Sequence, residues 1–333
     1  MKRVIGIGNA LTDMLVNLKS DEVLEKYGLP RGSMNLVDAN LQKEISKSVA
    51  GCPYTLSLGG SAANTIRAMA RLGVETGFIG KVGRDSTGDF FEQALVNLGV
   101  EPAIRRGELR SGRCVSLVSP DGERTMITYL GAALELTDAE VTAEILNRYD
   151  CLYIEGYLVQ DHDLIRGAVE RARSCGLKVA IDLASFNVVN ENLDFLRELA
   201  AKVDIIFANE QEAAAFTGAA TPEEALEIIS ATCELTIVKT GMRGALIRRR
   251  GEEPVHVGIM EAARRVDTTG AGDLYAAGFM AGLCEGLSLR QCGTMGAITA
   301  GKVIEVIGTT FGEEAWQHVD TLMEQVRRGE CLF

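Results

Sequence analysis

The stretch DTTGAGD at residues 267–273 decides how this sequence is interpreted, together with the apolar run LYAAGFMAGL that follows it at 274–283. The apolar run predicts a buried helix, which the small residues Gly270, Ala271 and Gly272 would open. Their backbone N–H groups would lie at the helix N-terminus, where the first donors are unpaired and the helix dipole is positive. The stretch therefore predicts a phosphate-binding anion hole.

Asp273 follows the anion hole directly, and a carboxylate at that place would repel a bound phosphate. We therefore expect it to have a chemical role, namely to accept or orient the proton of an attacking hydroxyl group. The alternative is an ordinary helix-capping aspartate after a glycine turn. Only three histidines are present, all outside motifs, which makes a carboxylate the better candidate for a general base.

Composition limits the class of protein. Of 333 residues, 47% are apolar, so a sizeable core is expected, and the net charge of −12 argues against nucleic acid or an anionic membrane as a partner. No run of 18 apolar residues is present, which predicts no membrane span. The eight cysteines lack zinc-site spacing. No signal-peptide pattern opens the chain, so a cytoplasmic location is expected.

From residue 140 onward, apolar strand-like runs alternate with helical ones, which predicts a parallel sheet covered on both faces. The expected strands are 151–154, 178–181, 205–208 and 235–238, with an antiparallel edge at 245–249 and 254–257. The expected helices are 161–174, 191–200, 210–216, 222–232, 273–285, 288–304 and 313–328. The fold class is therefore α/β with a mostly parallel sheet.

Before residue 140, two segments depart from the strand–helix alternation, at about 12–40 and 102–131. The second contains a predicted hairpin, because the pair Asp121-Gly122 lies between two strand-like runs. We expect both segments to form a small β-sheet lid inserted in a single domain that spans 1–333.

Polar residues near the first strand, 3–8, are candidates for binding an acceptor substrate. Asn9 and Asp13 follow this strand, and the carboxyl edge of an open α/β sheet faces the ligand crevice. The pair Gly59-Gly60 allows close backbone approach before a helix at 62–72, and Asn64 on its first turn could bind a hydroxyl group. The alternatives are a turn residue at Asp13 and a flexible connector at the glycine pair.

Other candidates follow later strands. Glu212 could hold water on Mg²⁺, a cation that keeps much of its hydration, or could simply complement a helix dipole. Gly241 and Gly244 could let the chain approach a nucleotide, or could form a plain hairpin. No Walker A motif is present, so a phosphoryl-transfer enzyme would depend on the anion hole at 270–272.

These motifs resemble those of the ribokinase-like (PfkB) sugar and nucleoside kinases over nearly the whole chain. The glycine pair with Asn64 is similar to the N-terminal motif of that family, 267–273 to its C-terminal motif, and Asn209 with Glu212 to its N-x-x-E element. Within the family, residues 6–10, 27–34, 124–126 and 129–132 resemble bacterial adenosine-kinase-like proteins.

The resemblance implies a Rossmann-type three-layer α/β/α core, a β-sheet lid, and ATP with Mg²⁺. It implies that Asp273 is the catalytic base and that Gly270, Ala271 and Gly272 form the anion hole. The other implied roles are acceptor binding by Asp13, Gly60 and Asn64, ATP binding by Asn209, Thr240, Gly241 and Gly244, a metal-ordering role for Glu212, and a monovalent cation, with K⁺ as the candidate, at Asp267 and Thr269. One departure is that Gly296 and Ala297 stand where some members place a nucleotide-binding asparagine.

The expected reaction is transfer of a phosphoryl group from ATP to a primary hydroxyl group. Adenosine is the first candidate acceptor, followed by ribose, fructose or a ketodeoxy sugar acid. The rival hypotheses are a non-catalytic sugar or nucleoside sensor and a nicotinamide oxidoreductase. The incomplete glycine fingerprint after the first strand counts against the oxidoreductase. The sequence leaves monomer and homodimer open.

Overall fold

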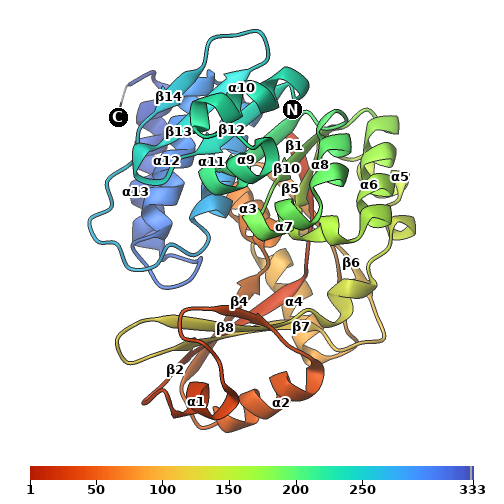
Figure 1. Cartoon of the computed structure of the whole chain (residues 1–333), viewed down its shortest axis with the longest axis vertical. Coiled ribbons are helices and arrows are strands. Elements are labelled where there is room, and N and C mark those ends of the chain that lie inside the picture. Colours follow the sequence, from red (N-terminus) through yellow and green to blue (C-terminus); the bar gives the residue numbers. More distant parts are fainter. Residues whose placement is uncertain (331) are drawn as a thin grey trace.

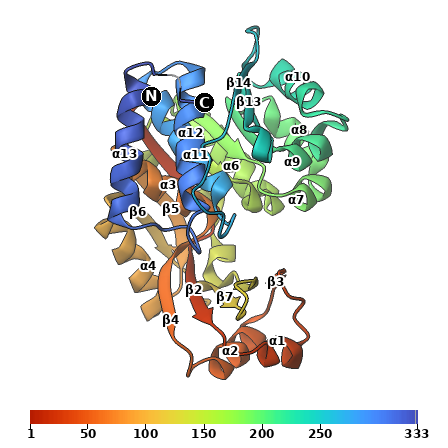
Figure 2. The same cartoon turned by 90° about the vertical axis from the view of Figure 1, so that its left-hand side faces the viewer.

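The computed structural model describes residues 1–330 and 332–333. Its strands form a nine-stranded sheet and a separate five-stranded sheet. Figure 1 shows the small sheet below the large one, with helices α1 (Glu22–Tyr27) and α2 (Ala39–Ser48) on the far side of the small sheet. Figure 2 shows the same separation from the side.

The large sheet has the strand order β14-β13-β12-β11-β10-β9-β1-β5-β6. It is parallel from β6 to β12, and β13 and β14 add an antiparallel edge. The expected antiparallel edge is thus confirmed. The bounds are β1 Arg3–Ile7, β5 Glu75–Val82, β6 Val100–Arg106, β9 Cys151–Glu155, β10 Lys178–Asp182, β11 Ile205–Asn209, β12 Leu235–Lys239, β13 Ala245–Arg249 and β14 Val255–Val257.

Helices cover both faces of this sheet, which confirms the three-layer α/β/α expectation. Alternate strand residues face opposite layers: Tyr153 belongs to the apolar cluster on one face, and Ile154 belongs to the cluster on the other. One layer contains α3 Ser61–Arg71, α4 Ser86–Asn97, α11 Ala271–Glu285, α12 Leu289–Val303 and α13 Glu313–Arg327. The other contains α5 Ala143–Leu146, α6 His162–Ser174, α7 Phe186–Glu191, α8 Leu193–Ala200, α9 Glu210–Thr217 and α10 Pro222–Thr232.

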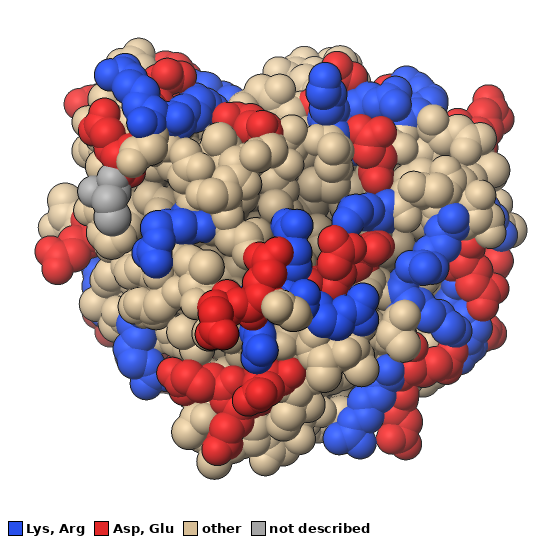
Figure 3. Space-filling view, turned by 90° about the horizontal axis from the view of Figure 1, so that it is seen from above, with Lys and Arg blue, Asp and Glu red and all other residues tan. Residues whose placement is uncertain are grey.

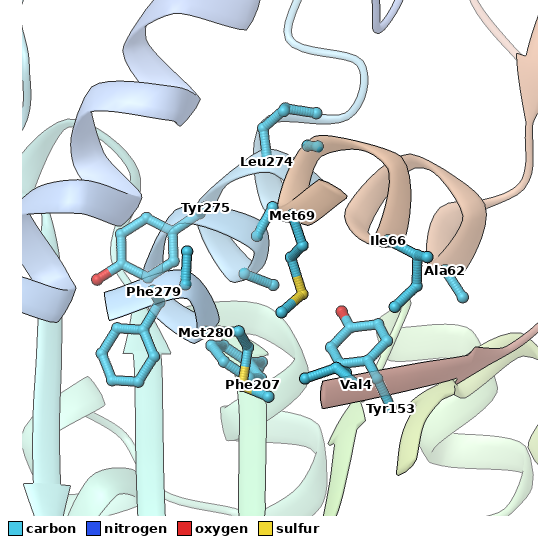
Figure 4. Packing of buried hydrophobic residues seen from close by; sticks show 14 of the residues in the cluster. Val4, Ala62, Ile66, Met69, Tyr153, Phe207, Leu274, Tyr275, Phe279 and Met280 are labelled. Atoms are coloured by element: carbon cyan, nitrogen blue, oxygen red, sulfur yellow. The ribbon is translucent and has the colours of Figure 1, made fainter. Parts of the chain in front are cut away.

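Figure 4 shows how α3 and α11 pack onto the centre of the sheet. Ile66 and Met69 from α3 and Phe279 from α11 point toward strand residues such as Tyr153 and Phe207. Phe207 and Phe279 meet edge to face, with ring centroids 5.5 Å apart. This shared core fixes the N-terminal ends of α3 and α11 relative to each other.

The small sheet has the strand order β3-β8-β7-β2-β4. Its strands are β2 Leu11–Asn17, β3 Met34–Leu36, β4 Tyr54–Gly59, β7 Gly112–Val118 and β8 Arg124–Tyr129. A third apolar cluster lies between this sheet and α1 and α2, and includes Val16, Leu24, Ile45 and Val115. One face of the sheet is thereby covered by helices.

The structure corrects several boundaries that we expected from the sequence. β6 lies partly in the segment 102–131, yet it joins the large sheet, because β5, α4 and β6 form a strand–helix–strand unit that pairs β6 parallel to β5. The expected helix 191–200 is preceded by a separate helix, α7. We did not expect β4 or α2, although Asp38 caps α2 by accepting from the N–H groups of Asn40 and Leu41. Asp13 lies within β2 rather than in a turn.

In the described part of the chain, no helix is long and apolar enough to cross a membrane. The described cysteines are free thiols, and Cys331 lies outside the described residues. Within the described residues, no group of three or more histidine, cysteine, aspartate or glutamate side chains could hold a metal ion.

Gly278 gives a test of how closely α11 and α12 pack. A Cβ atom at this position would lie 2.4 Å from the carbonyl oxygen of Met295 and 2.5 Å from Oγ1 of Thr299. We expect Gly278→Ala to lower the free energy of unfolding by about 1–3 kcal/mol, because the added methyl group overpacks the interface. Urea unfolding measures this. The matched control is Gly51→Ala, where the methyl group meets nothing within 4 Å; equal effects of the two substitutions would contradict the packing argument.

Candidate active site

A cavity of about 1000 Å³ lies where the carboxyl ends of the large-sheet strands face the small sheet. It brings together most of the residues that the sequence singled out. Those that line it are Asn9, Asp13, Gly60, Asn64, Asn209, Glu212, Gly241, Gly244, Thr269, Gly270, Ala271, Gly272 and Asp273. Gly59, Thr240 and Asp267 do not line it.

The expected anion hole lies at the start of α11. Gly270 adopts a left-handed conformation with φ 74°, and a Cβ atom there would lie 2.4 Å from Cγ2 of Thr309, so both conformation and space favour glycine. The N–H of Ala271, which we expected to belong to the anion hole, instead donates to the carbonyl oxygen of Thr268 at 3.2 Å. Among the described residues, the N–H groups of Gly272 and Asp273 have no protein acceptor. These two donors are therefore available to an anion.

Asp273 is held by two side chains from the first turn of α3. Ser61 Oγ donates to its Oδ1 at 2.7 Å, and Asn64 Nδ2 donates to its Oδ2 at 2.9 Å. Burial raises the pKa of Asp273 to about 6, and the two hydrogen bonds act against this rise. The carboxylate is thus fixed in orientation and remains ionised at neutral pH, as a general base requires.

Asn64 contacts Asp273 and also a buried cation. Its Oδ1 accepts from Nη2 of Arg67 and from Oγ1 of Thr309, both at 3.1 Å. Arg67 lies one turn further along α3 and also donates to the carbonyl oxygen of Thr309 at 2.6 Å. Asn64 is therefore a positioning residue for Asp273 in this structure. We did not identify Arg67 from the sequence, although an arginine three residues after Asn64 on a buried helix face is such a signal.

Asp13 faces the cavity from β2, opposite the glycine pair. A Cβ atom at Gly59 would lie 2.1 Å from Oδ1 of Asp13, and one at Gly60 would lie 2.2 Å from the carbonyl oxygen of Asn9. The pair is thus needed to make room for these two groups. Burial raises the pKa of Asp13 to about 6, while the charges of Arg124 and Arg67 counteract that rise.

Glu155, at the end of β9, is a cavity residue that sequence reasoning missed. Its carboxylate accepts from Nδ2 of Asn9 at 2.6 Å and from the N–H of Ala62 at 3.0 Å, so it binds the N-terminus of α3. Burial raises its pKa to about 7. The available signal was its place immediately after the buried run 151–154, at the same sheet edge as Asn9.

A buried ion pair lies beside the anion hole. Lys239, at the end of β12, donates to Oδ2 of Asp182, at the end of β10, at 2.7 Å. Its Nζ would lie 3.2 Å from a Cβ atom placed on Gly272. Burial disfavours the ammonium ion, but Asp182 and Glu212 more than compensate, so the pKa of Lys239 is raised. Lys239 is therefore a positive charge at the anion hole.

Asn209 and Glu212 form a capping box at the start of α9. Oε2 of Glu212 accepts from the N–H of Asn209 at 2.8 Å, Oε1 accepts from its Nδ2 at 2.6 Å, and the N–H of Glu212 donates to Oδ1 of Asn209 at 2.9 Å. Burial raises the pKa of Glu212 to about 7. The capping box is the helix-terminus role that we gave as the alternative for Glu212. Glu212 also lies near Asp182, whose charge acts on it, and the ordering of water on Mg²⁺ by these carboxylates stays a prediction.

Thr240, Gly241 and Gly244 form one tight turn after β12. Oγ1 of Thr240 donates to the carbonyl oxygen of Gly244 at 3.0 Å. Gly241 and Gly244 both have positive φ, 60° and 90°. The two glycines line the cavity. Thr240 does not line it, and its hydroxyl group stabilises the turn through the hydrogen bond to Gly244.

Asp267, expected to bind a monovalent cation, is instead paired with a side chain of the small sheet. Arg124, from β8, forms an ion pair with it, and their side chains are only 10% and 11% exposed. The same carboxylate accepts from the N–H and Oγ1 of Thr269 and from the N–H of Gly308. This donor set does not fit a metal ion at Asp267.

Two groups of apolar residues line the cavity, and polar residues such as Asp13 and Asp273 line it as well. The small-sheet group comes from the small sheet and from the turns after β8 and β9, and consists of Met34, Leu36, Met126, Leu130, Leu134, Leu136, Tyr157 and Leu158. The α12 group comes from the chain after β14 and from α12, and consists of Gly258, Ile259, Met260, Ala297, Ala300, Gly301 and Ile304. The cavity therefore offers apolar surface from two different parts of the chain.

The outer surface differs from this cavity in character. Figure 3 shows acidic and basic side chains interspersed on the face of the molecule seen from above. Both signs are therefore present on this face, although the net charge of the chain is −12.

Comparison with known proteins gives one family and several close structures. A family model described as pfkB family carbohydrate kinase matches residues 32–316. The crystal structure of adenosine kinase from Sinorhizobium meliloti is 35% identical, with a TM-score of 0.85 and coverage of 96% of this chain and 99% of that one. The structure of a probable sugar kinase from Rhizobium etli is 33% identical, with a TM-score of 0.86 and coverage of 96% and 98%. Adenosine kinase of Saccharomyces cerevisiae is 27% identical over 93% of this chain and 97% of its own.

The hydrogen bond from Ser61 predicts a measurable change in the acidity of Asp273. We expect Ser61→Ala to raise the pKa of Asp273 from about 6 by about one pH unit, because a donor to the ionised form is lost. The pH dependence of the carboxyl ¹³C chemical shift, assigned with Asp273→Asn, measures this. Ser174→Ala on the surface of α6 is the control. An unchanged or lowered pKa in Ser61→Ala would show that this contact does not act on the carboxylate.

Proposed function

Because the chain belongs to the pfkB family of carbohydrate kinases, we propose that it transfers the γ-phosphoryl group of ATP to the primary hydroxyl group of a nucleoside, with adenosine as the first acceptor. Membership of the family makes it a kinase of sugars or nucleosides. The observation that carries the finer proposal is the cavity lined by two groups of apolar residues and by polar residues such as Asp13 and Asp273. The α12 group suits the base of ATP, and the small-sheet group suits the base of an acceptor nucleoside.

In the proposed reaction, Asp273 takes the proton of the acceptor hydroxyl group. The hydroxyl oxygen forms a bond to the γ-phosphorus, and the bond from that phosphorus to the β,γ-bridging oxygen breaks, which releases ADP. The N–H groups of Gly272 and Asp273 and the ammonium group of Lys239 stabilise the negative charge on the transferring group. Bound Mg²⁺, held by the phosphates and through water by Glu212 and Asp182, would neutralise phosphate charge. Asp13 binds hydroxyl groups of the acceptor sugar.

The small-sheet group of apolar residues suits a nucleobase better than a sugar acid. Leu134, Leu36 and Met34 are 65%, 60% and 47% exposed although they line the cavity, so an apolar ligand would remove them from water. A sugar acid would instead need a cation beside these apolar residues. Arg124 and Lys239, which line the cavity, are already paired with carboxylates. Arg265 also lines the cavity, but it precedes Val266, whose N–H donates to the carbonyl oxygen of Ile304 in the α12 group.

The experiment that tests the acceptor class is a panel with ATP and Mg²⁺ that contains adenosine, ribose, fructose and 2-keto-3-deoxygluconate. We expect kcat/KM for adenosine to exceed that for each sugar by about 10²-fold or more, because only the nucleoside has a base that covers the small-sheet group of apolar residues. A sugar as the best acceptor would assign the chain to the sugar kinases of the same family. ATP hydrolysis that no acceptor stimulates would support a sensor.

Replacing the proposed base tests the mechanism. We expect Asp273→Asn to lower kcat by roughly 10²–10⁴-fold, the usual contribution of a positioned general base. In the parent enzyme kcat should fall as the pH decreases below about 6, because burial raises the pKa of Asp273 to about 6 and the protonated form cannot accept a proton. Steady-state kinetics against pH measures both effects. The control is Asp163→Asn, whose side chain is 98% exposed; near-normal turnover of Asp273→Asn would remove Asp273 from the role of base.

A further inference from the structure

Arg124 connects the small sheet to the loop that forms the anion hole. It lies at the start of β8, donates to Oγ of Ser116 on β7 at 3.0 Å, and pairs with Asp267 in the loop before α11. Two residues after Asp267, Thr269 lines the cavity next to Gly270. The guanidinium group therefore lies between two parts of the chain that are far apart in sequence.

The carboxylate of Asp267 is saturated with donors. Oδ1 accepts from the N–H of Thr269 at 3.0 Å and from its hydroxyl group at 2.7 Å. Oδ2 accepts from the N–H of Gly308 at 2.8 Å and from Nη1 of Arg124. A carboxylate offers about four lone-pair positions. All four are used, so Asp267 has no free position for a metal ion.

The negative charge of Asp267 is also compensated by the positive charge of Arg124. Arg124 is 10% exposed and Asp267 is 11% exposed, and a single buried charge of either sign would be costly without the other. Although burial opposes ionisation, the hydrogen bonds from Gly308 and Thr269 and the charge of Arg124 hold the pKa of Asp267 below its ordinary value. The loop before the anion hole thus already has one positive charge bound to its carboxylate.

We propose that the guanidinium group of Arg124 is the built-in monovalent cation of the anion-hole loop, so that this chain needs no K⁺ there. The inference rests on the proposed kinase function and concerns the same site. Guanidinium supplies the single positive charge that an alkali-metal ion would supply, and its directed N–H groups also fix the loop to the small sheet. Arg124 is thus a positioning residue, which acts on the transferring phosphoryl group through the loop.

The test compares KCl with tetramethylammonium chloride at equal ionic strength, about 100 mM, so that general screening is constant. Two readouts are taken: kcat with the best acceptor, and the melting temperature of the ligand-free protein. For the parent enzyme we expect both readouts to be the same in the two salts within error. A saturable increase with K⁺ would overturn the proposal.

The variant Arg124→Met leaves the carboxylate of Asp267 without its cation. We expect kcat to fall roughly 10- to 100-fold in tetramethylammonium, because the loop loses its position. K⁺ should then restore part of kcat and raise the melting temperature, since a lone pair of Asp267 becomes free. Arg124→Lys should keep most of the activity and remain insensitive to K⁺. If K⁺ changes neither kcat nor the melting temperature of Arg124→Met, the proposal that the guanidinium group takes the place of a metal cation is overturned.

Two further variants keep the test decisive. Arg31→Met removes an exposed arginine that pairs with Asp121 near the small sheet, and should behave as the parent enzyme. If Arg124→Met folds poorly, the double variant Arg124→Met with Asp267→Asn should recover stability and lose the response to K⁺, because no buried anion remains. The melting temperatures need no turnover, so absence of kinase activity would refute the proposed function without deciding the question of the cation.

Discussion

The half-buried carboxylate of Asp273, held between the N-terminal ends of two helices, is the constraint on which the rest of the site depends. Asp273 belongs to the first turn of α11, and the hydrogen bonds that fix it come from Ser61 and Asn64 on the first turn of α3. The two helices are fixed to each other by their common packing on the large sheet. A carboxylate that burial makes costly to ionise is thus kept oriented and ionised close to two unpaired N–H groups.

The residues that contact Asp273 are themselves held by hydrogen bonds from a further layer of side chains. Glu155 binds the N-terminus of α3, and Arg67 binds Asn64, so each side chain that touches Asp273 is itself held. Glycine is needed at positions 59 and 60 because side chains there would collide with Asp13 and with the backbone of Asn9. The small sheet contributes Asp13 and Arg124 to the lining of the cavity, and Arg124 also connects it to the loop before α11.

Much of this organisation could be predicted from the sequence, because it depends on local signals. The alternation of strands and helices predicts the parallel sheet, and the motif 267–273 predicts a helix N-terminus with an adjacent acid. The contacts between distant segments could not be predicted this way. Nothing local shows that Arg124 pairs with Asp267 across 143 residues, that Glu155 binds the start of α3, or that β6 joins the large sheet and not the small one.

The role of Asp273 as the base is tested most directly by a crystal structure with adenosine, ADP, Mg²⁺ and aluminium fluoride, which mimics the transferring phosphoryl group. The planar fluoride group should lie at the N–H groups of Gly272 and Asp273, and the 5′-oxygen of adenosine should lie about 2.6–3.2 Å from the carboxylate of Asp273. Adenosine bound with its 5′-oxygen away from Asp273, or the fluoride group bound elsewhere in the cavity, would contradict that role.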